Sequence, residues 1–443
     1  MNKSITDTSI ETTSLIPESA LSSNGEPQWL HEMRIAALKD YNEAALPPRG
    51  VALWRYTDPT RFLIDPDQLV AKSSSDSCHE LAVSDRDRVD IDRVAALVTD
   101  CCGREIEINA GSNLGDKVIL SSLISAMDTH EDLIRKYLGQ LVNSKTGKFE
   151  ATNTALWQDG LFVYVPDNTA VEKPIHLLRY ACGAGTTYLP RLLVVLGRNA
   201  RLTLIDEYIG GSAMTDDGYA AVNGAVEIFG GENSRCNYVS LQRQATGTRM
   251  YLSHRSRIER GAGAFTIPLA LGGGISKQSF GVDLNGEGAE SNIYGLLFGA
   301  GRQQFDNHTL HHHGAGHTIS NIDFKVVLRD KARSAYTGLI RIDQPARACE
   351  AYQENRNLLL NTGTRAETIP ELEILNEDVQ CSHGATIGPV DPEMVFFLEA
   401  RGIAREQAIA MIVSGFVAGT LEHIPETLRN RLVEVVRKRL EEN

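Results

Sequence analysis

The sequence predicts a mainly β protein, with a solenoid of stacked strands in the middle of the chain and helical domains at both ends. Two observations carry this prediction. Apolar residues recur with a period of roughly 3.6 in residues 27–154 and 389–443, but the period is near 2 in residues 155–388. Within this alternating zone a short glycine motif recurs, and strand-like segments follow it.

The N-terminal part of the chain is predicted to contain a disordered tail and a mostly helical domain. Residues 1–26 are rich in Ser and Thr, carry a single lysine, and lack the apolar stretch of a secretion signal. Residues 27–154 open with a helix after Pro27, and REIEIN at 104–109 alternates like a short strand. The apolar stripe of that first helix is Leu30, Met33, Ala37 and Tyr41.

The recurring motif of residues 155–388 is a tetrapeptide with the chemistry of a tight corner. Its first residue is Gly, its third Asn or Gly, and its fourth Ala or Ser. The third residue suits a left-handed turn conformation, and the small fourth residue fits a crowded corner. The copies lie at 197–200, 231–234, 261–264 and 286–289. Strands recurring at these intervals without crossover helices favour a β-solenoid over a large sandwich. A chance recurrence of glycine turns is the alternative.

Residues 389–443 are predicted to form a helical C-terminal domain. Asp391 and Pro392 suit the start of a helix, and Gly402 suits its end. After Pro425 a clean apolar stripe consists of Leu428, Leu432, Val435, Val436 and Leu440. We expect these helices to cap the last edge of the solenoid, because an open β edge invites aggregation.

Composition and missing motifs exclude several classes of function. The formal net charge of −13 argues against nucleic-acid binding, and no run of about 18 apolar residues predicts a membrane span. The seven scattered cysteines favour free thiols in a reducing compartment, so we expect a cytoplasmic protein. GSNLGDK at 111–117 has the wrong spacing for a P-loop, and the chain has no dinucleotide-binding glycine fingerprint. We therefore expect this chain to bind no nucleotide.

The densest histidine cluster is DNHTLHHHGAGH, which contains His308, His311, His312, His313 and His317. His311 and His313 would share one face of a strand, a geometry that a metal site tolerates. The cluster therefore allows a self-contained His-rich metal-binding protein. The alternative, which we favour, is that some of these side chains stack inside the solenoid and others are solvated.

The second candidate is Cys381 with His383, in VQCSHGATIG at 379–388. The two residues would project from one face of a strand. Catalytic Cys–His pairs are normally distant in sequence, and a complete zinc or iron–sulfur site needs about four ligands. What remains is half of a ligand set, completed by another subunit or a transient ligand, or else a buried thiol beside a satisfied histidine. A carbohydrate-active β-helix enzyme is a further rival, although its aromatic platforms are scarce in this zone.

Three stretches resemble a known family. They are LWRYTDPTRFL at 53–63, DKARSAYTGLIRID at 330–343, and LEILNEDVQCSHGATIGPVDPEMVFFLEARGI at 372–403. The chain resembles the SufB/SufD family of iron–sulfur cluster assembly proteins over roughly residues 45–425, and the CSHGAT wording is closer to the SufD branch.

The resemblance implies a fold, partners and a site. The fold would be a right-handed parallel β-helix between helical domains. The chain would be a non-catalytic scaffold subunit of a SufBCD-type complex, pairing with a SufB-like subunit through the β-helix edge. It would also bind a SufC-like ABC ATPase, which hydrolyses ATP, through about 391–425; the isolated chain could form a homodimer. His383, with Cys381 as the adjacent thiol, would help to hold iron or a transient iron–sulfur cluster shared with the SufB-like partner.

Overall fold

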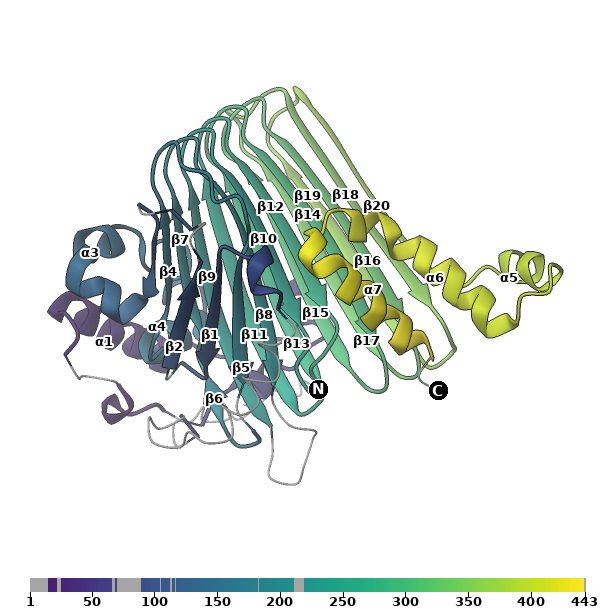
Figure 1. Ribbon diagram of the computed structural model, residues 1–443, viewed down its shortest axis with the longest axis horizontal. Helices are drawn as coiled ribbons and strands as arrows, with labels where there is room; N and C mark the ends of the chain where they lie inside the picture. The colour runs from purple at the N-terminus through teal and green to yellow at the C-terminus, as the bar shows by residue number, and fades with distance from the viewer. Residues whose placement is uncertain are drawn as a thin grey trace, which may run out of the picture.

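The central feature of the molecule is a long solenoid of parallel strands with helices near both termini (Figure 1). The computed structural model describes residues 15–21, 25–65, 68–69, 89–103, 105–111, 114–115, 117–181, 183–210 and 219–441. Two sheets face each other along the solenoid, and each turn of the chain adds one strand to each sheet. The predicted fold class is therefore confirmed.

We name the two sheets after their last strands. The β20 sheet contains, in spatial order, β2 (Glu105–Ala110), β1 (Ala96–Cys101), β5 (Ile175–Ala181), β8 (Arg201–Gly210), β10 (Arg235–Gln242), β12 (Gly263–Ala270), β14 (Glu290–Gly299), β16 (Ile319–Leu328), β18 (Cys349–Leu359) and β20 (Val379–Pro389). The β19 sheet contains β3 (Ile119–Ser122), β4 (Gly160–Val165), β7 (Arg191–Leu196), β9 (Ala220–Gly230), β11 (Thr248–Ile258), β13 (Ile275–Leu284), β15 (Gln304–His313), β17 (Arg333–Ile342) and β19 (Arg365–Ile374), with β6 (Thr187–Tyr188) beside β9. Pairing is parallel except between β1 and β2 and between β3 and β4.

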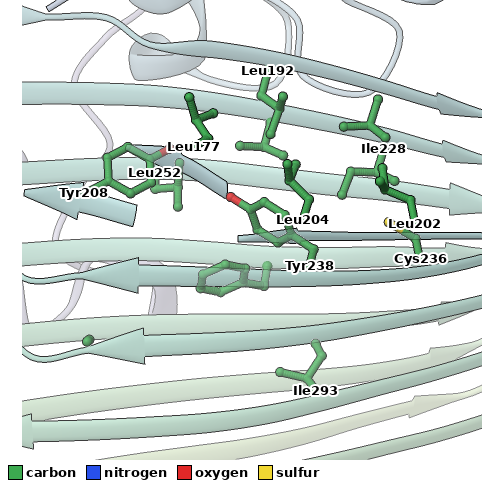
Figure 2. Packing of buried hydrophobic residues seen from close by; sticks show 14 of the residues in the cluster. Leu177, Leu192, Leu202, Leu204, Tyr208, Ile228, Cys236, Tyr238, Leu252 and Ile293 are labelled. Carbon is green, nitrogen blue, oxygen red and sulfur yellow. The ribbon is translucent and has the colours of Figure 1, made fainter. Parts of the chain in front are cut away.

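Side chains that alternate inward fill the space between the sheets. In-register positions of successive rungs form columns, such as Leu204, Tyr238, Thr266 and Ile293 in the β20 sheet. All four are buried, and Figure 2 shows three of them, Leu204, Tyr238 and Ile293, packed in the interior. The period of 2 in the sequence is thus the alternation between these inward columns and the outer faces.

The corners between the strands stack as regularly as the strands do. At one edge, seven residues with positive φ each donate their backbone N–H to a carbonyl of the next corner, over distances between 2.6 and 3.2 Å. These residues are Asn168, Asn199, Asn233, Gly261, Gly288, His317 and Ala348. The predicted corner chemistry is confirmed at 197–200, 231–234 and 286–289, where the fourth residue is fully buried.

The third predicted corner was wrong in its register. Gly261 has a φ of 63° and occupies the third position of a turn that runs from Glu259 to Ala262, closed by the Ala262 N–H on the Glu259 carbonyl at 3.0 Å. Gly263 and Ala264, taken from the sequence as part of this corner, already belong to β12. The sequence GAGA at 261–264 therefore matches the motif two residues after the turn that the chain actually forms.

The N-terminal helices cover the first strands of the β19 sheet. They are α1 (Gln28–Glu43), α3 (Leu123–Tyr137), which is kinked at His130, and α4 (Lys148–Leu156); short 3₁₀ helices span Glu18–Ala20, Ala52–Trp54, Pro59–Phe62 and Ile91–Arg93. Their apolar side chains pack on Phe162, Leu193 and Val195. Residues 105–109 of the REIEIN segment lie in β2, as predicted, and Arg104 lies outside the described residues. Within the predicted tail, Ile16 is buried and its N–H donates to Asn42, whereas residues 1–14 and 22–24 lie outside the described residues.

The C-terminal helices lie on a face of the solenoid, not on its edge. They are α5 (Pro392–Glu399), α6 (Arg405–Glu422) and α7 (Glu426–Glu441), and α6 and α7 run across the outer face of the β20 sheet, while α5 projects beyond β20 (Figure 1). Apolar residues on that outer face explain the position, because the helices bury them: Ile205, Val239, Leu241, Ile267, Leu269, Leu296, Phe298 and Val327. The expected cap on the last edge was therefore wrong. The Asp391 side chain accepts the Glu393 N–H and begins α5, as predicted.

Two further expectations concern membranes and thiols. Among the helices in the described part of the chain, none has the length and hydropathy needed to cross a bilayer. Cys101, Cys236, Cys349 and Cys381 are free thiols, as expected. Cys102 is disulfide-bonded, so the expectation was wrong there.

Candidate functional site at the open end of the solenoid

The solenoid ends in an uncovered rung made of β19 and β20. Each of these strands pairs on one side only, β19 with β17 and β20 with β18. Most side chains of β20 are exposed, in contrast to the strands before it. The predicted candidates Cys381 and His383 both lie on β20.

Both candidates point toward the interior, although no further rung covers them. Cys381 is in register with Ala351 on β18, and His383 with Gln353. Ala351 and Gln353 are buried inward-facing residues, only 0% and 3% exposed. At the same inward positions of the last rung, Cys381 is half-buried and His383 is exposed. The open end thus presents a thiol and an imidazole that would be buried if the solenoid continued.

The free edge of β20 also presents its backbone. The Glu350 N–H donates to the carbonyl of Thr318, the residue just before β16, so the even-numbered residues of β18 bond to β16 and the odd-numbered ones to β20. By the parallel register, the backbone groups of Cys381 and His383 point away from β18, to the open edge. A strand added there would bond directly to the two candidate residues.

The free edge of β19 is less regular. The Arg365 N–H donates to Ala332, so the odd-numbered residues of β19 bond toward β17 and the even-numbered residues face the open edge. Pro370 is one of the edge-facing residues and has no N–H to offer. An added strand would lose a hydrogen bond at Pro370, whereas β20 has no proline between Val379 and Gly388.

The thiol of Cys381 is held in its protonated form by its surroundings. Partial burial and the neighbouring Cys349 raise its pKa, while a backbone hydrogen bond from Ala351 acts in the opposite direction. His383 makes no hydrogen bond or ion pair with other described residues, so its ring is free to turn toward a ligand. A metal arriving at this end would displace the thiol proton, which links binding to proton release.

The histidine cluster is divided between two faces of β15 and a corner. His311 and His313 do share one face, as predicted, but that face is the interior, where they bond to hydroxyl groups of Ser291, Thr318 and Ser320. Burial lowers the pKa of His311 to about 3 and that of His313 to about 4. Both imidazoles are therefore neutral members of the core.

The other three histidines have separate environments. His312 lies on the outer face between Asp283 and Asp343, which raise its pKa. His308 is buried beside Asp306, and His317 occupies an exposed corner with positive φ. No cluster of three or more potential metal ligands occurs within the described ranges. The geometry therefore favours the interpretation of stacked and solvated side chains.

Comparison with known proteins agrees with this architecture. The family model described as the SufBD core domain of the SUF system for FeS cluster assembly matches residues 179–416, and the SufBD N-terminal region matches residues 17–177. The chain belongs to the SufB/SufD family. The core match includes β20 and ends within α6, so the SufB/SufD core contains the whole open end with Cys381 and His383.

Curated SufB/SufD relatives match along nearly the full chain. The iron–sulfur cluster assembly protein SufD of Bacillus subtilis is 26% identical over 429 residues, which cover 94% of this chain and 95% of the relative. A SufBD family protein of Staphylococcus saprophyticus is 24% identical over 407 residues, 90% and 87% of the two chains. One from Staphylococcus aureus strain MRSA252 is 25% identical over the same length.

The sequence indicates Cys381 and His383 as candidates, but it does not show that they lie on the terminal strand, whose position exposes them. The pattern of β20 is that of any other strand of the solenoid. The only sequence signal for its position is that it is the last strand before Pro392 and the helices.

Proposed function

We propose that this chain is a non-catalytic scaffold subunit of a SufBCD-type complex that assembles iron–sulfur clusters. In this proposal His383, with Cys381 beside it, holds iron or the nascent cluster at the interface with a SufB-like subunit. The single observation that carries the proposal is the exposure of an inward-facing thiol and imidazole at an unpaired solenoid edge. The curated relatives are named as iron–sulfur cluster assembly proteins, which supports the same conclusion.

An incomplete ligand set suits a site that must release its product. Iron–sulfur clusters are held tightly by four thiolates, whereas one thiolate and one imidazole supply half of the coordination. The remaining ligands would come from the partner, so separating the two edges would expose and weaken the site. Cluster assembly and transfer could then be controlled by the same interface.

The SufB-like subunit would bind by strand addition at the open end. The uninterrupted backbone of β20 offers hydrogen bonds, and exposed apolar side chains at the same end offer surface to bury. Ile374, Leu375 and Ile387 are 39%, 51% and 45% exposed. When the SufB-like subunit is missing, the same edge could pair two copies of this chain into a homodimer.

The ATPase would dock on the C-terminal helices. Four large apolar side chains of α5 and α6 are strongly exposed: Met394, Phe396, Phe397 and Met411, at 56%, 70%, 56% and 53%. Such side chains are the anchors that protein interfaces bury. In the proposal they contact a SufC-like ABC ATPase, which binds and hydrolyses the nucleotide. A cytoplasmic location stays a prediction, which the four free thiols support and the disulfide at Cys102 does not.

Co-expression with SufB-like and SufC-like subunits tests the proposal. Purification should yield a complex, and after anaerobic reconstitution with iron and sulfide it should show the charge-transfer absorption of a cluster. His383→Ala should lower the cluster content at least several-fold while the complex still forms. Ser382→Ala is the matched control, because Ser382 lies on the same exposed strand and points to the opposite face.

The outcomes separate the role from the site. If no complex forms, the scaffold role is refuted. If the complex forms and His383→Ala carries as much cluster as Ser382→Ala, the scaffold role stands and the assignment of His383 is refuted.

A further inference from the structure

A cavity lies on the outer face of the β19 sheet, over β11, β13 and β15, where the N-terminal segment at residues 44–54 crosses it. Its volume is about 290 Å³. One wall is apolar and comes from the N-terminal segment, with Pro47, Leu53 and Trp54. The opposite wall is polar and comes from successive strands of the sheet, with Arg255, Ser279 and His308 on β11, β13 and β15. Leu53 and Trp54 belong to the LWRYTDPTRFL stretch, which the proposed function leaves unexplained.

The cavity is bounded by a rigid frame. Trp54 packs against Phe149 with ring centroids 5.0 Å apart and stacks on Tyr251 at 6.1 Å. Lys277 is only 3% exposed, and its Nζ donates to the Leu53 carbonyl at 2.6 Å and to Asp306 at 3.0 Å. These contacts tie the N-terminal segment to the sheet, so the space between them is a built feature of the fold.

Two polar groups at the cavity have unused hydrogen-bonding capacity. Arg255 donates through Nη1 to the carbonyls of His254 and Ser279 and to the Ser279 hydroxyl, and no carboxylate of the described residues forms an ion pair with it. His308 is 4% exposed, and its Nε2 lies 2.7 Å from Asp306, whereas its Nδ1 has no partner among the described residues. That nitrogen is enclosed by protein atoms, so Arg255 is the group of the two that can reach a ligand in the cavity.

Charge selects the kind of ligand. Lys277 is neutralised by Asp306, and the one carboxylate in the lining, Glu150, accepts a hydrogen bond from Tyr251 at 2.6 Å. Glu150 stays an anion in this bond, whereas the lining cations Arg255 and Lys148 donate to carbonyl and hydroxyl oxygens and to no carboxylate of the described residues. The lining therefore keeps an excess of positive charge. Guanidinium groups bind planar carboxylates through paired hydrogen bonds, and an aromatic wall favours an apolar body.

We propose that this cavity binds a small organic carboxylate. The carboxylate lies on Arg255 and Ser279, and the apolar body packs against Trp54 and Leu53. Occupancy would stabilise the N-terminal segment on the β19 sheet, because the ligand contacts both walls.

Benzoate is the probe for this site, and benzamide, of the same shape but uncharged, is its matched control. In calorimetric titrations of the full-length protein we expect saturable benzoate binding at millimolar concentration and at least tenfold weaker benzamide binding. Arg255→Gln should weaken benzoate binding at least tenfold. Arg257→Gln should leave it unchanged, because Arg257 lies two residues along β11 and pairs with Asp283 outside the cavity.

Several results would overturn the proposal. The first is the absence of saturable binding at benzoate concentrations up to roughly 20 mM, which suit a weak fragment. The second is an equal affinity of the protein for benzoate and benzamide. The third is an equal affinity of Arg255→Gln and Arg257→Gln for benzoate. A crystal soaked in benzoate is the second measurement, and it does not depend on a variant that folds. A ring between Trp54 and Arg255 supports the proposal, and density only elsewhere refutes it.

Discussion

The interior position of His311 predicts that this residue makes the fold sensitive to acid. Burial lowers its pKa to about 3, whereas an imidazole in the unfolded chain titrates near about 6.5. Between these values the unfolded chain binds a proton that the folded chain does not. The free energy of unfolding must therefore fall as the pH drops below about 6.5, by about 1.4 kcal/mol per pH unit for this one group. At pH 5 the loss amounts to about 2 kcal/mol.

The variant His311→Gln removes this titration and keeps a side chain that can bond to Ser291. Urea unfolding should be followed between pH 7 and pH 5 for both proteins. We expect the variant to start less stable, because a packed ring is lost, but to lose about 2 kcal/mol less over this range.

His317→Gln is the control, since it removes an imidazole that is exposed on a corner of the solenoid. Its free energy of unfolding should be followed over the same pH range, which separates the loss of an interior imidazole from the loss of an imidazole at an exposed corner. If His311→Gln and the unmodified protein lose the same free energy between pH 7 and pH 5, the assignment of His311 as a neutral core residue is refuted.

Three other predictions concern packing and charge. A Cβ on Gly286 would lie 1.9 Å from the backbone nitrogen of Arg260 in the preceding corner, so Gly286→Ala should lower the melting temperature. A Cβ on Gly388 would meet no atom within 4 Å, so Gly388→Ala should leave the melting temperature unchanged. Leu428 lies on the buried face of α7 and is 1% exposed, so Leu428→Ala should lower the free energy of unfolding in urea by about 2–5 kcal/mol. Val433→Ala on the same helix, at 48% exposure, should lower it by less than about 1 kcal/mol. The two aspartates that flank His312 raise its pKa in the folded protein. The stability that this interaction adds is therefore fully present at a pH below the pKa of the unfolded chain, and it is lost as the pH rises through the raised pKa of the folded protein. Replacing both by Asn should lower the midpoint of the His312 ring signals in an NMR titration.

The solenoid could be predicted because its two signals are local. Alternation along a strand and a left-handed corner residue such as Asn199 or Asn233 are properties of a few neighbouring residues. The error at GAGA is of the same local kind. Residues 261–264 satisfy the motif, but the turn that forms runs from Glu259 to Ala262 and begins with Glu in place of Gly. Only the hydrogen bonds to the neighbouring corners decide that Gly261 is the left-handed residue.

The position of the C-terminal helices could not be predicted from their own pattern. The stripe at Leu428 and Leu432 predicts that a face is buried but not which surface buries it. The answer lies in outward-facing apolar residues of distant strands, such as Val239 and Phe298, which look like ordinary strand residues in the sequence. Prediction of the site had the same limit. The chemistry of Cys381 and His383 is visible in the sequence, but their exposure results from the C-terminal helices packing on the face of the β20 sheet and leaving the last rung uncovered.

The number of turns in the solenoid decides what its open end can bind. If the chain turned into its C-terminal helices one rung earlier, β18 would be the terminal strand, and Ala351 and Gln353 would replace Cys381 and His383 at the mouth. Neither could ligate a soft metal. One rung more would bury the thiol and the imidazole in a closed interior. Deletion of one rung would thus leave the thiol of Cys349 but no imidazole at the open end, and insertion of one rung would bury both groups.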